Sequence, residues 1–176
     1  KQPLINKEEN LILSVNGEIY NPRELKTDHC KHYNFKTESD CEIILALYEK
    51  YGIDFIDMLN GIFAFALFDK EKNHFLIARD HIGIIPLYKG YNENGTFFIA
   101  SELKALESYC NEISIFPPGH YMTNKSIEPV KWYKRNWISL SGTNKKKIKT
   151  IELKESLENA VHLSLIHISE PTRQIV

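Results

Sequence analysis

The segment Ile62–Phe68 most limits what this chain can fold into, because its residues, Ile-Phe-Ala-Phe-Ala-Leu-Phe, are all apolar. A strand with apolar side chains on both faces has to be covered by other layers on both sides. The run is also far shorter than the roughly 20 residues that a membrane-spanning helix needs. We therefore expect a sheet in the middle of a layered globular domain.

Helix and strand patterns surround this segment. Ser39 and Glu42 match a capping box, and the apolar residues after them recur at helical spacing as far as Gly52, which suits a helix end. A strand is predicted over Leu11–Val15 and a short helix over Pro22–Lys26. The other predicted elements are strands over Phe75–Ala78, Leu87–Tyr91, Thr96–Ala100, Ile113–Phe116, Gly119–Thr123 and Val130–Tyr133, and a short helix over Ser101–Glu107. This mixture is typical of an α+β domain in which sheet packs on sheet and helices lie outside.

Length and charge exclude several classes of protein. The 176 residues are enough for one domain with a tail. The 22 Lys and Arg residues against 23 Asp and Glu residues leave a net charge of −1, so no overall field attracts nucleic acid or an anionic membrane. Three cysteines are too few for a disulfide framework, and we expect a reducing compartment such as the cytoplasm.

The composition changes after residue 138. Residues 139–150 are rich in Ser, Gly, Thr, Asn and Lys, which is typical of a linker. A helix is predicted to begin near Ile151, and residues 151–165 are expected to start a second domain. We expect residues 166–176 to be a non-native tail. The first domain is therefore predicted over residues 1–138.

The motif Asn16-Gly17-Glu18 has two interpretations. Asn-Gly is the commonest pair in a hairpin turn, at which the first strand would end. Alternatively, the Asn16 amide and the Gly17 backbone N–H point at the oxyanion that develops during acyl transfer. Glu18 and Asp40 could then pair with the ammonium group of a bound amino acid. Asp40 also suits the first turn of a helix on electrostatic grounds alone.

Two further motifs are interpreted as structural. The dense segment Arg79–Tyr88 is expected to be a tight loop in which Arg79 and Asp80 bond to the backbone or to each other. His81 is expected to be a polar loop residue and not a base. His29-Cys30-Lys31-His32 has metal-binding residue types, but no second Cys or His pair follows at a suitable spacing, so no metal site is expected.

Several segments, taken in order, point to one family. They are Val15–Asn21, Ser39–Glu42, Leu59–Ala66, Arg79–Tyr88, Ala100–Leu106 and Phe116–Gly119. Together they resemble the glutaminase domain of glutamine-dependent asparagine synthetases, one of the class II glutamine amidotransferases. The resemblance covers residues 2–165.

The resemblance implies an α+β fold, a four-layer αββα sandwich of the N-terminal-nucleophile hydrolase type, here truncated at its N-terminal strand. It implies that the domain hydrolyses L-glutamine and needs no cofactor itself. The ammonia would pass to a C-terminal synthetase domain that converts aspartate to asparagine with ATP and Mg²⁺. The resemblance is compatible with a homodimer of the intact enzyme, and no nucleic acid or membrane partner is expected.

Position by position, the resemblance implies that the Asn16 side chain and the Gly17 backbone N–H form the oxyanion hole. Glu18 and Asp40 would bind the amino group of glutamine. The family's nucleophile is a cysteine at the first position, and its α-amino group, with a pKa of roughly 7.7 to 8.0, is the base. Residue 1 here is Lys1, so the cysteine and the arginine for the glutamine carboxylate are expected upstream, and the chain alone is expected to be inactive.

Two alternatives stay open. The chain could be the glutaminase domain of another class II amidotransferase, such as one that forms glucosamine phosphate or phosphoribosylamine. It could also be a non-catalytic glutamine-binding module that has lost its nucleophile. Cys41 lies where the family has no nucleophile, and Cys30 and Cys110 have no adjacent base, so none of them is assigned that role.

Overall fold

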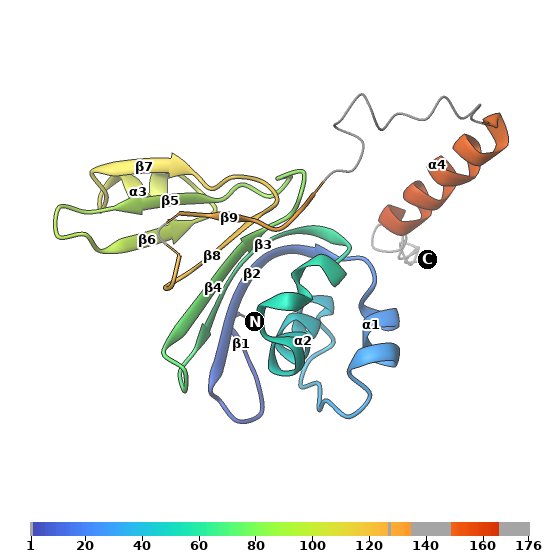
Figure 1. Ribbon diagram of the computed structural model, residues 1–176, viewed down its shortest axis with the longest axis horizontal. Coiled ribbons are helices and arrows are strands. Elements are labelled where there is room, and N and C mark those ends of the chain that lie inside the picture. Colours follow the sequence, from blue (N-terminus) through green and yellow to red (C-terminus); the bar gives the residue numbers. More distant parts are fainter. Residues whose placement is uncertain (1, 127, 135–148, 166–176) are drawn as a thin grey trace, which may run out of the picture. The chain divides into compact units, whose positions relative to one another are not determined.

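The computed structural model describes residues 2–126, 128–134 and 149–165 (Figure 1). The chain divides into two units, residues 1–134 and 135–176. In the second unit the described element is helix α4 (Thr150–Leu165), which matches the helix predicted near Ile151. Most of the predicted linker and all of the predicted tail lie outside the described residues. Over the described ranges, no helix is both long and apolar enough to cross a membrane.

Among the described residues, the first unit is built around a six-stranded antiparallel sheet. Inside this sheet, β2 (Leu11–Ile19) pairs along its whole length with β3 (Gly61–Asp69). The remaining strands are β1 (Leu4–Ile5), β4 (His74–Arg79), β8 (His120–Thr123) and β9 (Val130–Lys131), in the order β1-β2-β3-β4-β8-β9. β1 was not predicted from the sequence.

β3 contributes to two separate apolar clusters, one on each face of the sheet. Phe63, Phe65 and Leu67 belong to the larger cluster, and Ala64 belongs to the other. The side chain of Phe68, near the end of the strand, is 40% exposed. The prediction of a central strand covered on both sides is therefore confirmed.

Helices cover one face of the six-stranded sheet. They are α1 (Pro22–His29) and α2 (Ile43–Tyr51), with the 3₁₀ turns η1 (Asp40–Glu42) and η2 (Gly52–Met58) before and after α2. Figure 1 shows α1 and α2 together on this side. Ile43, Ile44 and Leu47 of α2 are fully buried in the same cluster as Phe63 and Phe65. Burial of this apolar face holds the helices against the sheet.

A second sheet covers the other face. It consists of β5 (Tyr88–Tyr91), β6 (Phe97–Ala100) and β7 (Glu112–Ile115) in the order β6-β5-β7. Leu87, Phe116 and Phe97 pack in one cluster with Ala64 and Ile77 of the first sheet.

The fourth layer lies on the outer side of the second sheet. It is the short helix α3 (Lys104–Glu107) and the residues that follow it. Tyr109 stacks on Phe98, which points away from the first sheet, and Cys110 closely approaches Gly90 of β5. Helices, sheet, sheet and helix therefore follow one another, and the predicted αββα sandwich is confirmed.

The interpretation of Asn16-Gly17 as a hairpin turn is wrong. β2 continues through the motif, with Asn16 opposite Ala64 and Gly17 opposite Phe63. Gly17 has a φ of +133°, and a Cβ atom there would lie 2.0 Å from the carbonyl oxygen of Ile62. The glycine is needed because the two backbones approach closely inside the sheet, and not because the chain reverses.

The predicted capping box at Ser39 is also wrong. The Ser39 side chain makes no capping hydrogen bond, and the helix starts with the 3₁₀ turn η1. The buried Glu42 carboxylate instead accepts hydrogen bonds from the backbone N–H groups of Lys36 and Thr37, at 2.6 and 2.7 Å, and from the Thr37 hydroxyl. The Glu42 side chain turns into the protein because these loop donors would otherwise be buried without a hydrogen-bond acceptor.

We expect Gly17→Ala to lower the free energy of unfolding by at least about 3 kcal/mol, because the new methyl group meets backbone atoms in a strained conformation. Gly95→Ala is the matched control. Gly95 also has a positive φ, +74°, but nothing lies within 4 Å of its Cβ position. Its substitution should cost only about 1 kcal/mol. Urea denaturation of both variants measures the difference, and equal costs would contradict the close approach of β2 and β3.

Candidate functional site

One hydrogen bond brings the start of the α2 region to the end of β2. The backbone N–H of Ile19 donates to Oδ2 of Asp40 at 2.6 Å. Asp40 is the first residue of η1, so this bond fixes η1 beside the Asn16-Gly17-Glu18 motif. A charged acceptor makes such a bond stronger than one between neutral groups.

A cavity of about 530 Å³ opens at this junction. Its lining residues are Gln2, Leu4, Val15, Asn16, Gly17, Thr37, Glu38, Ser39, Asp40 and Cys41. The structure therefore brings Asn16, Gly17 and Asp40 together around one hollow. Within the described part of the chain, the Asn16 amide makes no hydrogen bond to protein, so it is available to a ligand. A hollow with a free amide and a carboxylate at its wall suits a polar molecule that carries an amino group.

Glu18 lies next to this cavity and is not part of its wall. Its side chain is exposed on β2, where the residue pairs with Ile62. Its charge nevertheless acts on the site, because Glu18 contributes to the raised pKa of Cys41. Of the predicted site residues, Glu18 alone is placed at the margin of the hollow.

Cys41 is a buried thiol behind the motif. Its Sγ lies 3.6 Å from the carbonyl oxygen of Gly17 and 3.6 Å from Oδ2 of Asp40. Burial raises the pKa of Cys41 to about 12, and the negative charge of Asp40, its hydrogen bond and the charge of Glu18 add to the effect. A thiol that stays protonated is a hydrogen-bond donor and a poor nucleophile. That Cys41 is not the catalytic cysteine stays a prediction.

Gln2 is a wall residue that the sequence did not single out. Its side-chain amide forms two hydrogen bonds with the backbone of Val15: Nε2 donates to the carbonyl oxygen, and Oε1 accepts from the N–H at 2.8 Å. The Gln2 side chain thus pairs with the β2 backbone as a neighbouring strand would, and it forms part of the cavity wall together with Asn16. A single glutamine near the start of a chain carries no pattern that would reveal this contact.

The Arg79–Tyr88 loop supports the strand behind the site. Arg79 donates hydrogen bonds of 2.7 Å each to the carbonyl oxygens of Gly83, Ile85 and Phe116. Burial lowers the pKa of Arg79 from its usual value. The Asp80 carboxylate accepts from the backbone N–H groups of Phe63, Ile82, Gly83 and Ile84. The expectation that Arg79 and Asp80 bond to the backbone is confirmed, and His81 packs against the ring of Tyr133.

The His29–His32 segment forms part of a different surface. The Nδ1 atom of His29 lies 2.9 Å from the Tyr51 hydroxyl, and Cys30 is buried. Among the residues that the structure describes, no group of three His, Cys, Asp or Glu side chains is arranged to hold a metal ion.

Comparison with known proteins identifies the domain. The model of a family described as "Glutamine amidotransferase domain" matches residues 1–131. Asparagine synthetase B [glutamine-hydrolyzing] of Escherichia coli K12 is 46% identical over 165 residues, which is 94% of this chain and 30% of that protein. A probable asparagine synthetase [glutamine-hydrolyzing] of Dictyostelium discoideum is 48% identical over 91% of this chain and 30% of its own length. The chain thus spans about 30% of the length of these curated relatives.

A solved structure resembles the fold. Glutamine phosphoribosylpyrophosphate amidotransferase from B. subtilis superimposes with a TM-score of 0.65 at 23% identity, over 76% of this chain and 32% of that one. At this identity the likeness concerns the fold alone, and it confirms the predicted sandwich of the N-terminal-nucleophile hydrolase type. The family model covers most of the first unit, including the cavity at Asn16 and Asp40. The chain therefore belongs to the glutamine amidotransferase domain family.

Proposed function

We propose that this chain is the glutaminase domain of a glutamine-hydrolysing asparagine synthetase. The observation that carries the proposal is the Asp40–Ile19 hydrogen bond, which joins the acidic η1 turn to the Asn16-Gly17 stretch around one cavity. Relatives that bear this name are 42% to 48% identical to the chain, which supports the same assignment.

In the proposed reaction, L-glutamine lies in the cavity with its amino group near Asp40 and its side-chain carbonyl near Asn16. Glu18, at the margin, adds a second negative charge for the ammonium group. A cysteine thiolate supplied from outside these residues attacks the amide carbon, and the carbonyl oxygen becomes an oxyanion. The Asn16 amide and the Gly17 backbone N–H stabilise this oxyanion. Collapse to the thioester releases ammonia, and water then hydrolyses the thioester to glutamate.

The remaining chemistry belongs, by this proposal, to the rest of the enzyme. A C-terminal synthetase domain uses the ammonia to convert aspartate to asparagine and binds the ATP and Mg²⁺ for that step. The glutaminase domain itself needs no cofactor, and its partners are L-glutamine, the synthetase domain and a second copy in a homodimer. No nucleic acid or membrane takes part. The free thiols of Cys30, Cys41 and Cys110 fit a reducing compartment such as the cytoplasm.

Two other assignments compete with this one. The fold is shared with a phosphoribosylpyrophosphate amidotransferase. The glutaminase domain of another class II amidotransferase is therefore the second assignment. The much higher identity to asparagine synthetases favours the first assignment. The remaining assignment is a non-catalytic glutamine-binding module, and the coding sequence upstream of Lys1 tests it. A cysteine codon directly after a start codon supports the enzyme, whereas a start codon immediately before Lys1 supports the module.

Glutamine binding tests the amino-group site. We expect L-glutamine to shift the backbone amide NMR signals of Asn16 and Gly17, and Asp40→Asn to weaken binding about tenfold through loss of one charged contact. Asparagine keeps an acceptor for the Ile19 N–H, so the cavity should persist. Glu24→Gln on the exposed side of α1 is the control with the same change in charge. Equal affinities for Asp40→Asn, Glu24→Gln and the unchanged chain would refute the assignment of Asp40.

The cysteines give a second test. The polypeptide of these 176 residues should release no ammonia from L-glutamine, and Cys41→Ala should change nothing. Because the pKa of Cys41 is raised to about 12, only roughly one thiol in ten thousand is ionised at pH 8. Ellman's reagent should therefore label Cys41 slowly in the folded protein and rapidly after unfolding in guanidinium. Ammonia release that Cys41→Ala abolishes would overturn the assignment.

A further inference from the structure

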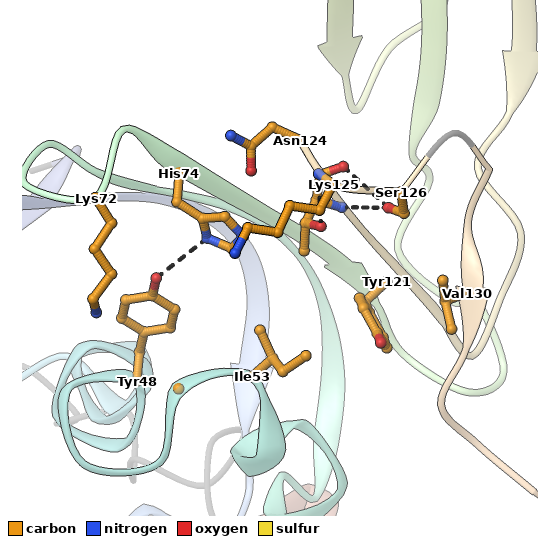
Figure 2. A pocket seen from close by; sticks show the side chains of 11 residues that line it. Tyr48, Ile53, Lys72, His74, Tyr121, Asn124, Lys125, Ser126 and Val130 are labelled. Carbon is orange, nitrogen blue, oxygen red and sulfur yellow. Dashed lines mark hydrogen bonds between the residues drawn. The ribbon is translucent and has the colours of Figure 1, made fainter.

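A second cavity, of about 480 Å³, lies within the first unit and shares no lining residue with the Asn16 cavity. It is bounded by the end of α2 and the start of η2, by the turn between β3 and β4, and by the β8–β9 hairpin (Figure 2). Its lining residues are Tyr48, Gly52, Ile53, Lys72, His74, Tyr121, Thr123, Asn124, Lys125, Ser126 and Val130. The reaction proposed above uses none of them.

Basic side chains gather in this wall. Lys72, His74 and Lys125 line the cavity, and no Asp or Glu is among the lining residues. Figure 2 shows the Lys125 side chain extended toward the His74 ring. A nearby carboxylate, that of Asp69, is not among the lining residues; its side chain is 3% exposed, and its Oδ2 forms a 3.0 Å salt bridge with Nζ of Lys72. The cavity thus presents positive charge to whatever enters it.

The pKa of His74 is sensitive to the positive charge around the cavity. Burial lowers the pKa of His74, and the positive charges of Lys125 and Lys72 lower it further, while Asp69 opposes them. An imidazole between two ammonium groups resists protonation unless an anion is added.

Hydrogen bonding occupies one nitrogen of His74 and leaves the other able to take up a proton. The Tyr48 hydroxyl donates its only hydrogen to Oδ2 of Asp69, at 3.2 Å. It can therefore only accept from Nδ1 of His74, which lies 3.4 Å away. The Nε2 atom then carries the lone pair of the neutral ring and becomes a second N–H donor when the ring is protonated.

The other side of the cavity is apolar. Ile53 comes from η2, Tyr121 from β8 and Val130 from β9. A hollow of this volume suits a small organic molecule better than a bare inorganic ion. Its two sides therefore require a ligand with an anionic end and an apolar body.

We propose that this cavity binds a small organic anion, with a phosphate or carboxylate group against Lys72, His74 and Lys125 and an apolar body against Ile53, Tyr121 and Val130. Binding brings a proton to Nε2 of His74, since the anion stabilises the imidazolium form. The groups that face this ring are Tyr48 from α2, Asp69 from the end of β3, Lys72 from the β3–β4 turn, and Lys125 from the β8–β9 hairpin. Affinity should accordingly rise as the pH falls from 8 to 6.

NMR titration of the His74 ring tests the proposal on the full chain, with the His74 signal assigned by its loss in His74→Gln. The probes are phenyl phosphate, benzoate, inorganic phosphate and phenol. Phenyl phosphate or benzoate should raise the pKa of His74 and bind at least about tenfold more tightly than phenol or inorganic phosphate. The first two probes distinguish a phosphate ligand from a carboxylate ligand.

Lys125→Gln should weaken binding of the better probe about tenfold, because it removes one charged contact. Lys7→Gln, on an exposed residue outside the cavity, changes the net charge equally and should leave the affinity unchanged. The proposal is overturned if no probe shifts the His74 signal, if both lysine variants weaken binding equally, or if inorganic phosphate binds as tightly as phenyl phosphate.

Discussion

The close approach of the β2 and β3 backbones is the constraint on which the candidate site depends. A Cβ atom at Gly17 would lie 2.0 Å from the carbonyl oxygen of Ile62, and one at Gly61 would lie 2.2 Å from that of Glu18. The two glycines therefore let each strand lie against the other strand's backbone at the end that carries the motif. Once β2 is held there, the Ile19 N–H is presented to Asp40, and the acidic turn closes over the strand. The wall of the cavity is thus a result of strand packing.

Sequence patterns predicted the layers well because they depend on burial. The apolar run at Ile62–Phe68 needs cover on both faces whatever the partners are, and both covers are present. The same reasoning failed at Asn16-Gly17, where local turn preferences ignore a partner strand that lies far along the chain. It failed again at Glu42, because a capping box assumes that the carboxylate turns back to Ser39, while the preceding loop offers better donors.

The candidate site was predictable only in part, for a related reason. Asn16, Gly17 and Asp40 carry chemistry that can be recognised one residue at a time, and the structure collects them around one cavity. The role of Gln2 depends on the position of its side chain against the backbone of Val15, and the spacing of residues in the sequence does not predict that contact. The basic cavity was also missed, since its charges come from separate segments, none of which is a motif.

Arg79 links the two sheets of the sandwich. It belongs to β4 of the six-stranded sheet, yet one of its hydrogen bonds goes to the carbonyl oxygen of Phe116, just after β7 of the other sheet. Sliding one sheet over the other would deprive that buried carbonyl of its donor, at a cost of roughly 1 to 3 kcal/mol. The neighbouring residue, Asp80, holds Phe63 opposite Gly17. Sliding of the two sheets is therefore resisted close to the point where β2 and β3 pair at Gly17.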